Sequence, residues 1–107
     1  MPTINIYHDD TTTINTVAIE KIKEFTAVAL TCGDITLTPN DMSVRLVKAD
    51  MQGAIASVEC DIAAYNFPER SAKQDAICAD IRGFMIGLLG SKDVRVRLQL
   101  CELGHSM

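Results

Sequence analysis

The sequence has no apolar stretch long enough to cross a bilayer. Its longest such run, residues 83–90 (GFMIGLLG), is far shorter than the ~20 residues that a membrane-spanning helix needs. The amino-terminal residues MPTINIYHDD have no basic stretch ahead of an apolar segment, as a secretory signal would have. We therefore expect no membrane span and a cytoplasmic setting.

Glycine and proline are also scarce, with six and three residues in 107, which excludes a collagen-like or disordered chain. The ten basic residues are outnumbered by fourteen acidic ones and are not clustered. A surface that binds nucleic acid through its phosphates is therefore not expected. The length fits a single domain that spans residues 1–107.

Metal-binding motifs are absent too. The four cysteines are separated by 28, 18 and 23 residues, which matches neither a zinc site nor a CxxC redox pair. The two histidines, His8 and His105, are remote from each other in the sequence. We expect reduced, mostly buried thiols and no metal site.

What is present in the first half is a strand, a helix and a second strand. Thr3–His8 alternates apolar and polar residues, as a half-buried strand does. After a polar segment with N-cap oxygens at residues 9–13, apolar residues recur at helical spacing as far as Gly33. Residues 42–50 alternate again and predict the second strand.

The same order of elements recurs in the second half. Residues 54–64 predict a strand whose inward side chains include Val58, Cys60 and Ile62. A loop at residues 68–71 ends in an N-cap, Ser71, and opens a helix that stops at Gly90. Residues 94–103 predict the fourth strand.

The two halves are also similar in sequence. MSVRLV (residues 42–47) and KDVRVR (residues 92–97) align at an offset of 50 residues, which places Arg45 against Arg95. We therefore predict an α+β, two-layer fold made of two β-α-β repeats, about residues 2–51 and about residues 54–104. Each repeat joins two parallel strands through a right-handed crossover helix, so four strands form one sheet with both helices on one face.

The opposite face of this sheet would be left uncovered. Val47, Ala49 and Ala56 lie on it in the predicted pattern, so we expect an apolar face that oligomerisation buries in a closed ring.

Pro2 follows Met1 directly, the segment PNDMSVRLVKADM covers residues 39–51, and PERSAKQDAICADI covers residues 68–81. Together these three features resemble the tautomerase superfamily. The chain is most similar to the branches that contain 5-carboxymethyl-2-hydroxymuconate isomerase and macrophage migration inhibitory factor. This resemblance implies a homotrimer without a cofactor that tautomerises a small unsaturated 2-hydroxy or 2-oxo acid.

In the families that the chain resembles, the base is an amino-terminal proline. Removal of Met1 would leave Pro2 with a secondary amine, and α-amino groups titrate near ~7.7–8.0, close to working pH. Alternatively, Pro2 simply starts an edge strand, where its missing N–H does no harm. In that case the chain would be a catalytically inactive ligand-binding or structural trimer.

The resemblance places a substrate-binding arginine at Arg45, whose planar guanidinium suits a carboxylate. The alternative is a salt bridge between subunits to Asp50, Glu59 or Asp61. Two further arginines, Arg95 and Arg97, are assigned to the strand edge or to a subunit contact.

Arg70, at the start of the second helix, is a second candidate to bind the small-molecule carboxylate. Alternatively, it is an exposed loop arginine paired with Glu69 or Asp75. Two aromatic residues beside this loop, Tyr65 and Phe67, either wall the cavity or pack.

One departure from the family pattern limits the substrate. Where 4-oxalocrotonate tautomerase has an arginine after the first strand, this chain has Asp9, Asp10 and Thr11. These carboxylates would repel a dicarboxylate, so we do not expect a dianionic substrate.

Overall fold

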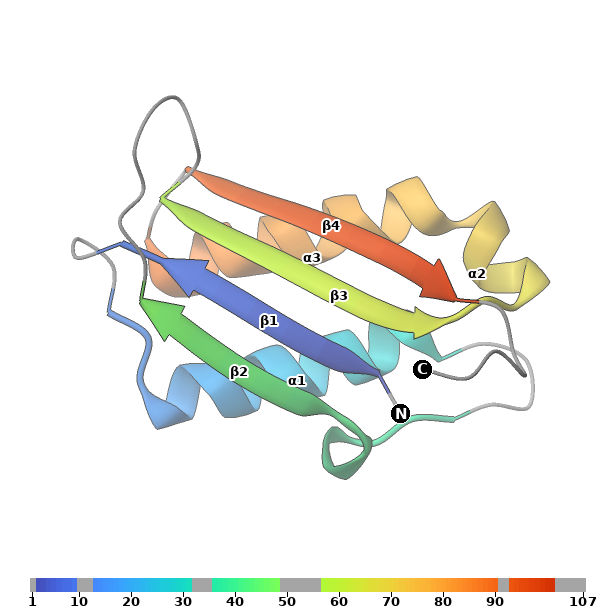
Figure 1. Ribbon diagram of the computed structural model, residues 1–107, viewed down its shortest axis with the longest axis horizontal. Coiled ribbons are helices and arrows are strands. Elements are labelled where there is room, and N and C mark those ends of the chain that lie inside the picture. Colours follow the sequence, from blue (N-terminus) through green and yellow to red (C-terminus); the bar gives the residue numbers. More distant parts are fainter. Residues whose placement is uncertain (1, 10–12, 32–35, 49–56, 91–92, 102–107) are drawn as a thin grey trace.

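The computed structural model describes residues 2–9, 13–31, 36–48, 57–90 and 93–101 and shows a two-layer α+β fold. The elements in chain order are β1 (Thr3–His8), α1 (Thr16–Leu30), the 3-10 turn η1 (Pro39–Asp41), β2 (Ser43–Lys48), β3 (Val58–Tyr65), α2 (Pro68–Ala72), α3 (Gln74–Leu89) and β4 (Val94–Cys101). The four strands form one sheet, and α1 and α3 lie together behind it (Figure 1). The predicted fold class is confirmed.

The sheet has the strand order β2-β1-β3-β4. The pairs β1/β2 and β3/β4 are parallel, and the central pair β1/β3 is antiparallel. Each parallel pair is connected through one long helix, α1 or α3, as a β-α-β unit requires. The two β-α-β units meet at the antiparallel central strands. The start of β1 and the end of β3 therefore lie at the same end of the sheet.

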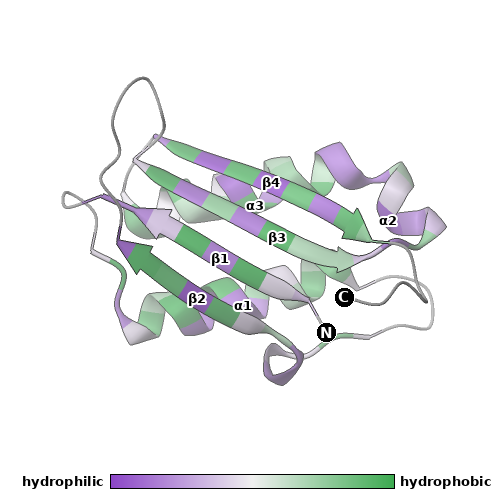
Figure 2. Ribbon diagram, viewed as in Figure 1, coloured by the Kyte–Doolittle hydropathy of each residue, from purple (hydrophilic) through white to green (hydrophobic). Residues whose placement is uncertain are grey.

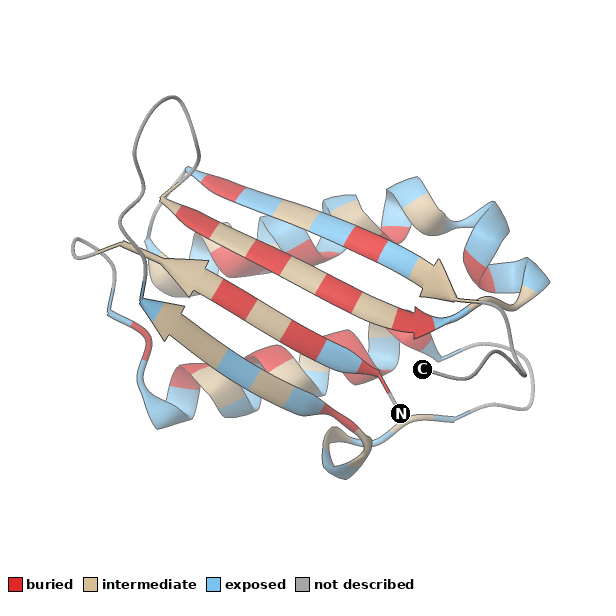
Figure 3. Ribbon diagram, viewed as in Figure 1, coloured by how far each residue is buried: buried red, intermediate tan, exposed pale blue. Residues whose placement is uncertain are grey.

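The core lies between the sheet and the helices. On β3, every second side chain from Val58 to Ala64 is buried, and on β1 Ile4 and Ile6 are fully buried (Figure 3). The inward orientation predicted for Val58, Cys60 and Ile62 is confirmed.

The start of α1 differs from the prediction, whereas the end of α3 agrees with it. α1 is capped by the Oδ1 atom of Asn15, which accepts a hydrogen bond of 2.8 Å from the backbone N–H of Ala18. The cap is therefore not in the segment at residues 9–13, and Gly33 lies outside the described residues. At the end of α3, Gly90 has the left-handed conformation (φ 69°) predicted for a helix stop.

The loop predicted at residues 68–71 is wrong. Pro68–Ala72 forms the short helix α2, in which the N–H of Ser71 donates to the Phe67 carbonyl over 3.0 Å. Pro68 favours this start because its fixed φ suits the first helical position. Ser71 is therefore inside a helix, and α3 starts after Lys73 instead.

The open face of the sheet is polar, which corrects the apolar face expected from the sequence. Hydrophilic and hydrophobic residues alternate along the strands (Figure 2). The charged residues of the open face are Arg45, Glu59, Asp61, Arg95 and Arg97, and the uncharged polar ones are Thr3, Asn5, Ser43 and Gln99. Val47 is on this face as predicted, but its row contains Glu59 and Arg95, and Ala49 and Ala56 lie outside the described residues. Burial of apolar area therefore does not by itself explain an oligomer here.

Candidate active site

Pro2 lies buried directly before β1. Its carbonyl oxygen accepts a hydrogen bond of 3.2 Å from the backbone N–H of Ser43, the first residue of β2. On the other side, the β1/β3 register pairs Thr3 with Ala63, and one more residue of antiparallel pairing places Pro2 opposite Ala64. The start of β1 is therefore held between the start of β2 and the end of β3.

Arg45 lies on β2, two residues beyond Ser43, which is about 6.5 Å along a strand. Its side chain is exposed on the open face, where its register partner on β1 is Asn5. Within the described part of the chain, Arg45 makes no hydrogen bond and no ion pair. Inside one chain, β1 lies between Arg45 and the two described acidic candidates, Glu59 and Asp61 on β3. The expected salt bridge between subunits stays a prediction.

Arg70 is not the exposed loop residue that one interpretation required. Its side chain is only 3 % exposed, and it donates to two backbone carbonyls over 2.8 Å each. The Nε atom binds the carbonyl of Leu30, the last residue of α1, and the Nη1 atom binds that of Tyr65, the last residue of β3. The guanidinium thus connects a helix end to a strand end behind the sheet.

The two aromatic candidates, Tyr65 and Phe67, are both near Arg70 but differ in their surroundings. Tyr65 is 38 % exposed, and its position in the alternation of β3 puts it on the open face with Ala63. Phe67 is half-buried, and its ring centroid lies 5.0 Å from the guanidinium carbon of Arg70. Tyr65 is therefore positioned to border a site on the open face, whereas Phe67 packs against Arg70.

A row of polar residues crosses the open face. The strand register aligns Arg45, Asn5, Asp61 and Arg97, one residue from each strand. Arg97 donates to both carboxylate oxygens of Asp61, from Nε over 3.1 Å and from Nη2 over 3.3 Å. Hydrogen bonding to Asp61 and the charge of its carboxylate raise the pKa of the Arg97 guanidinium above its usual range.

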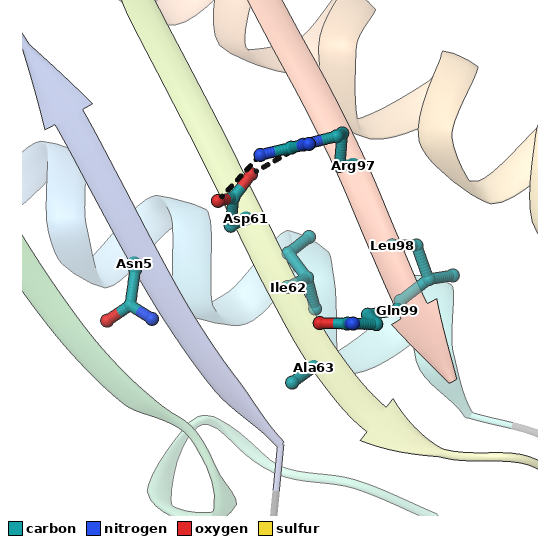
Figure 4. A pocket seen from close by; sticks show the side chains of 7 residues that line it. All are labelled: Asn5, Asp61, Ile62, Ala63, Arg97, Leu98 and Gln99. Carbon is teal, nitrogen blue, oxygen red and sulfur yellow. Dashed lines mark hydrogen bonds and ion pairs between the residues drawn. The ribbon is translucent and has the colours of Figure 1, made fainter. Parts of the chain in front are cut away.

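Next to this row is a hollow of about 380 Å³, which the sequence analysis missed (Figure 4). The side chains that line it on the open face are Asn5, Asp61, Ala63, Arg97 and Gln99. The hollow opens over the small Ala63 side chain. The amides of Asn5 and Gln99 and the Asp61–Arg97 pair surround it. The alternation of each strand showed which residues point outward, but only the register between strands shows which of them meet.

Two kinds of feature are absent from the described ranges. No three His, Cys, Asp or Glu side chains there gather in a way that could hold a metal ion. Among the described helices, none combines the length and the apolar character needed to span a membrane.

No protein-family model and no curated protein matches the sequence. Several solved structures do match in fold. A macrophage migration inhibitory factor-like protein from Entamoeba histolytica is 10% identical, with a TM-score of 0.67 over 94% of this chain and 89% of that chain.

Two further structures bear the same likeness. N1, a member of the cis-3-chloroacrylic acid dehalogenase family, is 10% identical, with a TM-score of 0.66 over 94% of this chain and 75% of that chain. A fused 4-OT, described as a wild type symmetric trimer, is 21% identical, with a TM-score of 0.62 over 94% and 85% of the two chains. The chain therefore has the tautomerase fold that its sequence patterns indicated.

Proposed function

We propose that this chain is a member of the tautomerase superfamily that interconverts the keto and enol forms of a small unsaturated 2-hydroxy or 2-oxo acid without a cofactor. The observation that carries the proposal is the link between Pro2 and β2. The hydrogen bond from Ser43 to the Pro2 carbonyl fixes a potential amine base beside the strand that presents Arg45. An amine beside a guanidinium that has no partner among the described residues suits a substrate with an acidic proton and a carboxylate.

In the proposed reaction, Pro2 carries the proton. Once Met1 is removed, the prolyl nitrogen is a secondary amine, and shielding from water in a closed site would favour its neutral, basic form. The nitrogen takes the proton of the substrate's enol hydroxyl, and the electron pair left on oxygen forms the carbonyl. The protonated amine then returns its proton to the carbon at the far end of the enol, which restores the free base.

Arg45 binds the substrate carboxylate through charge-assisted hydrogen bonds in this proposal. Tyr65 borders the site on the open face. We assign Arg70 and Phe67 to the support of the site instead of to substrate binding, because both Nε and Nη1 of Arg70 already donate to backbone carbonyls.

We further propose that the chain acts as a homotrimer. Two structures of the same fold are fused 4-OT proteins described as symmetric trimers. The polar open face, with acidic residues on β3 and basic residues on the two edge strands, would contact other copies through ion pairs and water instead of through apolar packing. Sedimentation at micromolar concentration tests the assembly, and a monomer at all concentrations would contradict it.

Enol–keto conversion of phenylpyruvate tests the activity. Intact mass first separates protein that starts at Pro2 from protein that retains Met1 or carries an amino-terminal tag. We expect turnover only with a free Pro2, because an acylated nitrogen cannot accept a proton. The variant Pro2→Ala should keep part of the activity, since its primary amine is still a base. Equal turnover by free and extended proteins would exclude the prolyl mechanism, and no turnover by either would favour the ligand-binding or structural trimer.

A further inference from the structure

We infer that the hydroxyl groups of Thr3 and Ser43 bind the oxygen atom at C2 of the acid and make the site selective for acids that carry one. The inference rests on the proposed function, in which Pro2 is the base and Arg45 binds the carboxylate. It adds two residues to that site, and its evidence is their place in the strand register.

The two hydroxyl side chains lie side by side at the start of the parallel strand pair. Thr3 is the first residue of β1 and Ser43 the first residue of β2, and the register pairs them. Neighbouring strands are about 4.8 Å apart, and both side chains are exposed on the open face. The backbone N–H of Ser43 donates to the Pro2 carbonyl, so the hydroxyl pair is attached to the residue that carries the base (Figure 1).

Both hydroxyl groups are available to a ligand. Neither makes a hydrogen bond to another group within the described ranges of the chain. Beyond Thr3, the next residue in the row is Ala63, whose side chain is a single methyl group and does not cover the pair. The pair is also uncharged, so it takes no part in the ion pairs proposed between copies.

The order of these groups along the strands matches the order of atoms in a 2-oxo acid. Arg45, which binds the carboxylate at C1, lies about 6.5 Å beyond Ser43 on β2, and its long side chain can lean back toward the start of the strand. The hydroxyl pair comes next. The prolyl nitrogen, which exchanges protons with the oxygen at C2 and the carbon at C3, lies directly before Thr3. An acid held by Arg45 therefore has its C2 oxygen beside the two hydroxyls.

Hydroxyl groups suit an oxygen atom that changes during the reaction. Each hydroxyl can donate one hydrogen bond and can also accept hydrogen bonds. The pair can thus donate to the C2 carbonyl of the keto form, and it can donate to and accept from the C2 hydroxyl of the enol form. A lysine or arginine could only donate, and it would hold the enol hydroxyl less well.

The test is a calorimetric titration of protein that starts at Pro2 with two acids that have the same carbon skeleton. One is 3-phenyllactate, which has a hydroxyl group at C2, and the other is 3-phenylpropanoate, which lacks it. Neither acid has keto and enol forms to interconvert, so binding is measured without turnover. We expect the native chain to bind one enantiomer of 3-phenyllactate about tenfold more tightly than 3-phenylpropanoate, as one or two added hydrogen bonds allow. Equal affinities, or no binding of either acid, would overturn the inference.

The double variant Thr3→Val/Ser43→Ala should lose this preference. The ratio of the two affinities should fall below about twofold, while the affinity for 3-phenylpropanoate changes less than about twofold. Both side chains are exposed, and valine keeps the shape of threonine, so the variant should fold. Each single variant should lose part of the preference. A preference that persists in the double variant would overturn the inference.

Gln99→Ala is the matched control. It removes a polar side chain from the same row of the sheet, but on the far edge strand β4. Its preference for 3-phenyllactate should equal that of the native chain, and a loss there would overturn the inference, because the polarity of the whole face would then explain the effect. Arg45→Gln should weaken both acids alike, since both have the carboxylate. A loss confined to 3-phenyllactate in Arg45→Gln would assign the C2 oxygen to the arginine and would contradict the subsite.

The comparison of binding with turnover separates this inference from the proposed function. Suppose that the preference is lost in Thr3→Val/Ser43→Ala and that the native protein does not turn over phenylpyruvate. This result would support the subsite and contradict the tautomerase. A preference that the double variant retains, in a protein that does turn over phenylpyruvate, would do the reverse.

Discussion

The Nε atom of Arg70 donates to the carbonyl oxygen of Leu30 over 2.8 Å, although forty residues separate the two. The carbonyls at the end of a helix have no partners within the helix, so a buried arginine there supplies a donor that water cannot. The same guanidinium binds the Tyr65 carbonyl. One side chain thus joins α1 to the end of β3, beside the place where Pro2 lies.

Replacement of Arg70 by alanine should destabilise the fold. It would leave the buried Leu30 carbonyl and the partly buried Tyr65 carbonyl without these donors and would open a space beside Phe67. We expect the free energy of unfolding to fall by about 3 kcal/mol, measured by urea denaturation. Arg82→Ala is the control, because among the described residues exposed Arg82 donates only to the Val94 carbonyl, and the loss of this bond should cost about 1 kcal/mol or less. An Arg70→Ala protein with normal stability and a raised KM would instead identify Arg70 as a substrate-binding residue.

Replacement of Arg45 by glutamine should affect substrate binding and leave stability unchanged. The side chain is exposed and has no partner within the described residues, so its loss removes no hydrogen bond or ion pair among them. The lost carboxylate contact should lower kcat/KM for a 2-oxo acid about tenfold or more, with most of the effect in KM. Arg95→Gln serves as the control, because the internal repeat aligns Arg95 with Arg45 on the other edge strand. If both variants lower kcat/KM equally, general charge and not a specific contact explains the loss.

Two glycines in α3 should be replaceable with a gain in stability. A Cβ atom at Gly83 or Gly87 would contact nothing within 4 Å, and neither residue has a positive φ. Since glycine is less favourable than alanine in a helix interior, Gly83→Ala and Gly87→Ala should each raise the free energy of unfolding by about 0.5–1 kcal/mol.

Gly90 provides the contrasting substitution at the end of the same helix. Its φ of +69° is unfavourable for a residue with a Cβ atom, although space is available there too. Gly90→Ala should therefore lower stability by about 1 kcal/mol in the same denaturation experiment. A gain at Gly90, or losses at Gly83 and Gly87, would contradict this account.

Cys60 should make stability fall at alkaline pH. Burial, followed by the charge of Asp61 and the nearby Cys78, raises the pKa of the Cys60 thiol from 9.0 to about 12. The unfolded chain therefore loses this proton at lower pH than the folded chain, so unfolding becomes easier as pH rises between about 9 and 12. This one group should contribute a slope of about 1.4 kcal/mol per pH unit.

The measurement is the free energy of unfolding against pH for the native chain and for Cys60→Ala, whose curve should lack this slope. Cys101→Ala, which leaves the buried thiol in place, should keep it. In the folded protein, Cys60 should also fail to react with a thiol reagent at pH 8, since the reactive thiolate is almost absent. Rapid labelling of Cys60 without unfolding would contradict the assigned burial.

Much of the fold could be predicted from local patterns. The alternation of Thr3–His8 predicted β1 with both ends correct, and Gly90 marked the end of α3. Such features are recoverable because a strand shows its buried face every second residue and a helix stop depends on one backbone conformation. The repeated order of elements then led to the sheet with two covering helices.

The site depended on contacts between distant parts of the chain. The sequence left Arg70 as either a carboxylate-binding residue or an exposed loop arginine, because its partners Leu30 and Tyr65 meet it only in the folded chain. The outward position of Asp61 was predictable, but its pairing with Arg97 follows from the register of β3 and β4. A local pattern shows which face a side chain takes, whereas its neighbour on that face depends on how strands are aligned, and that alignment arises from packing of the whole core.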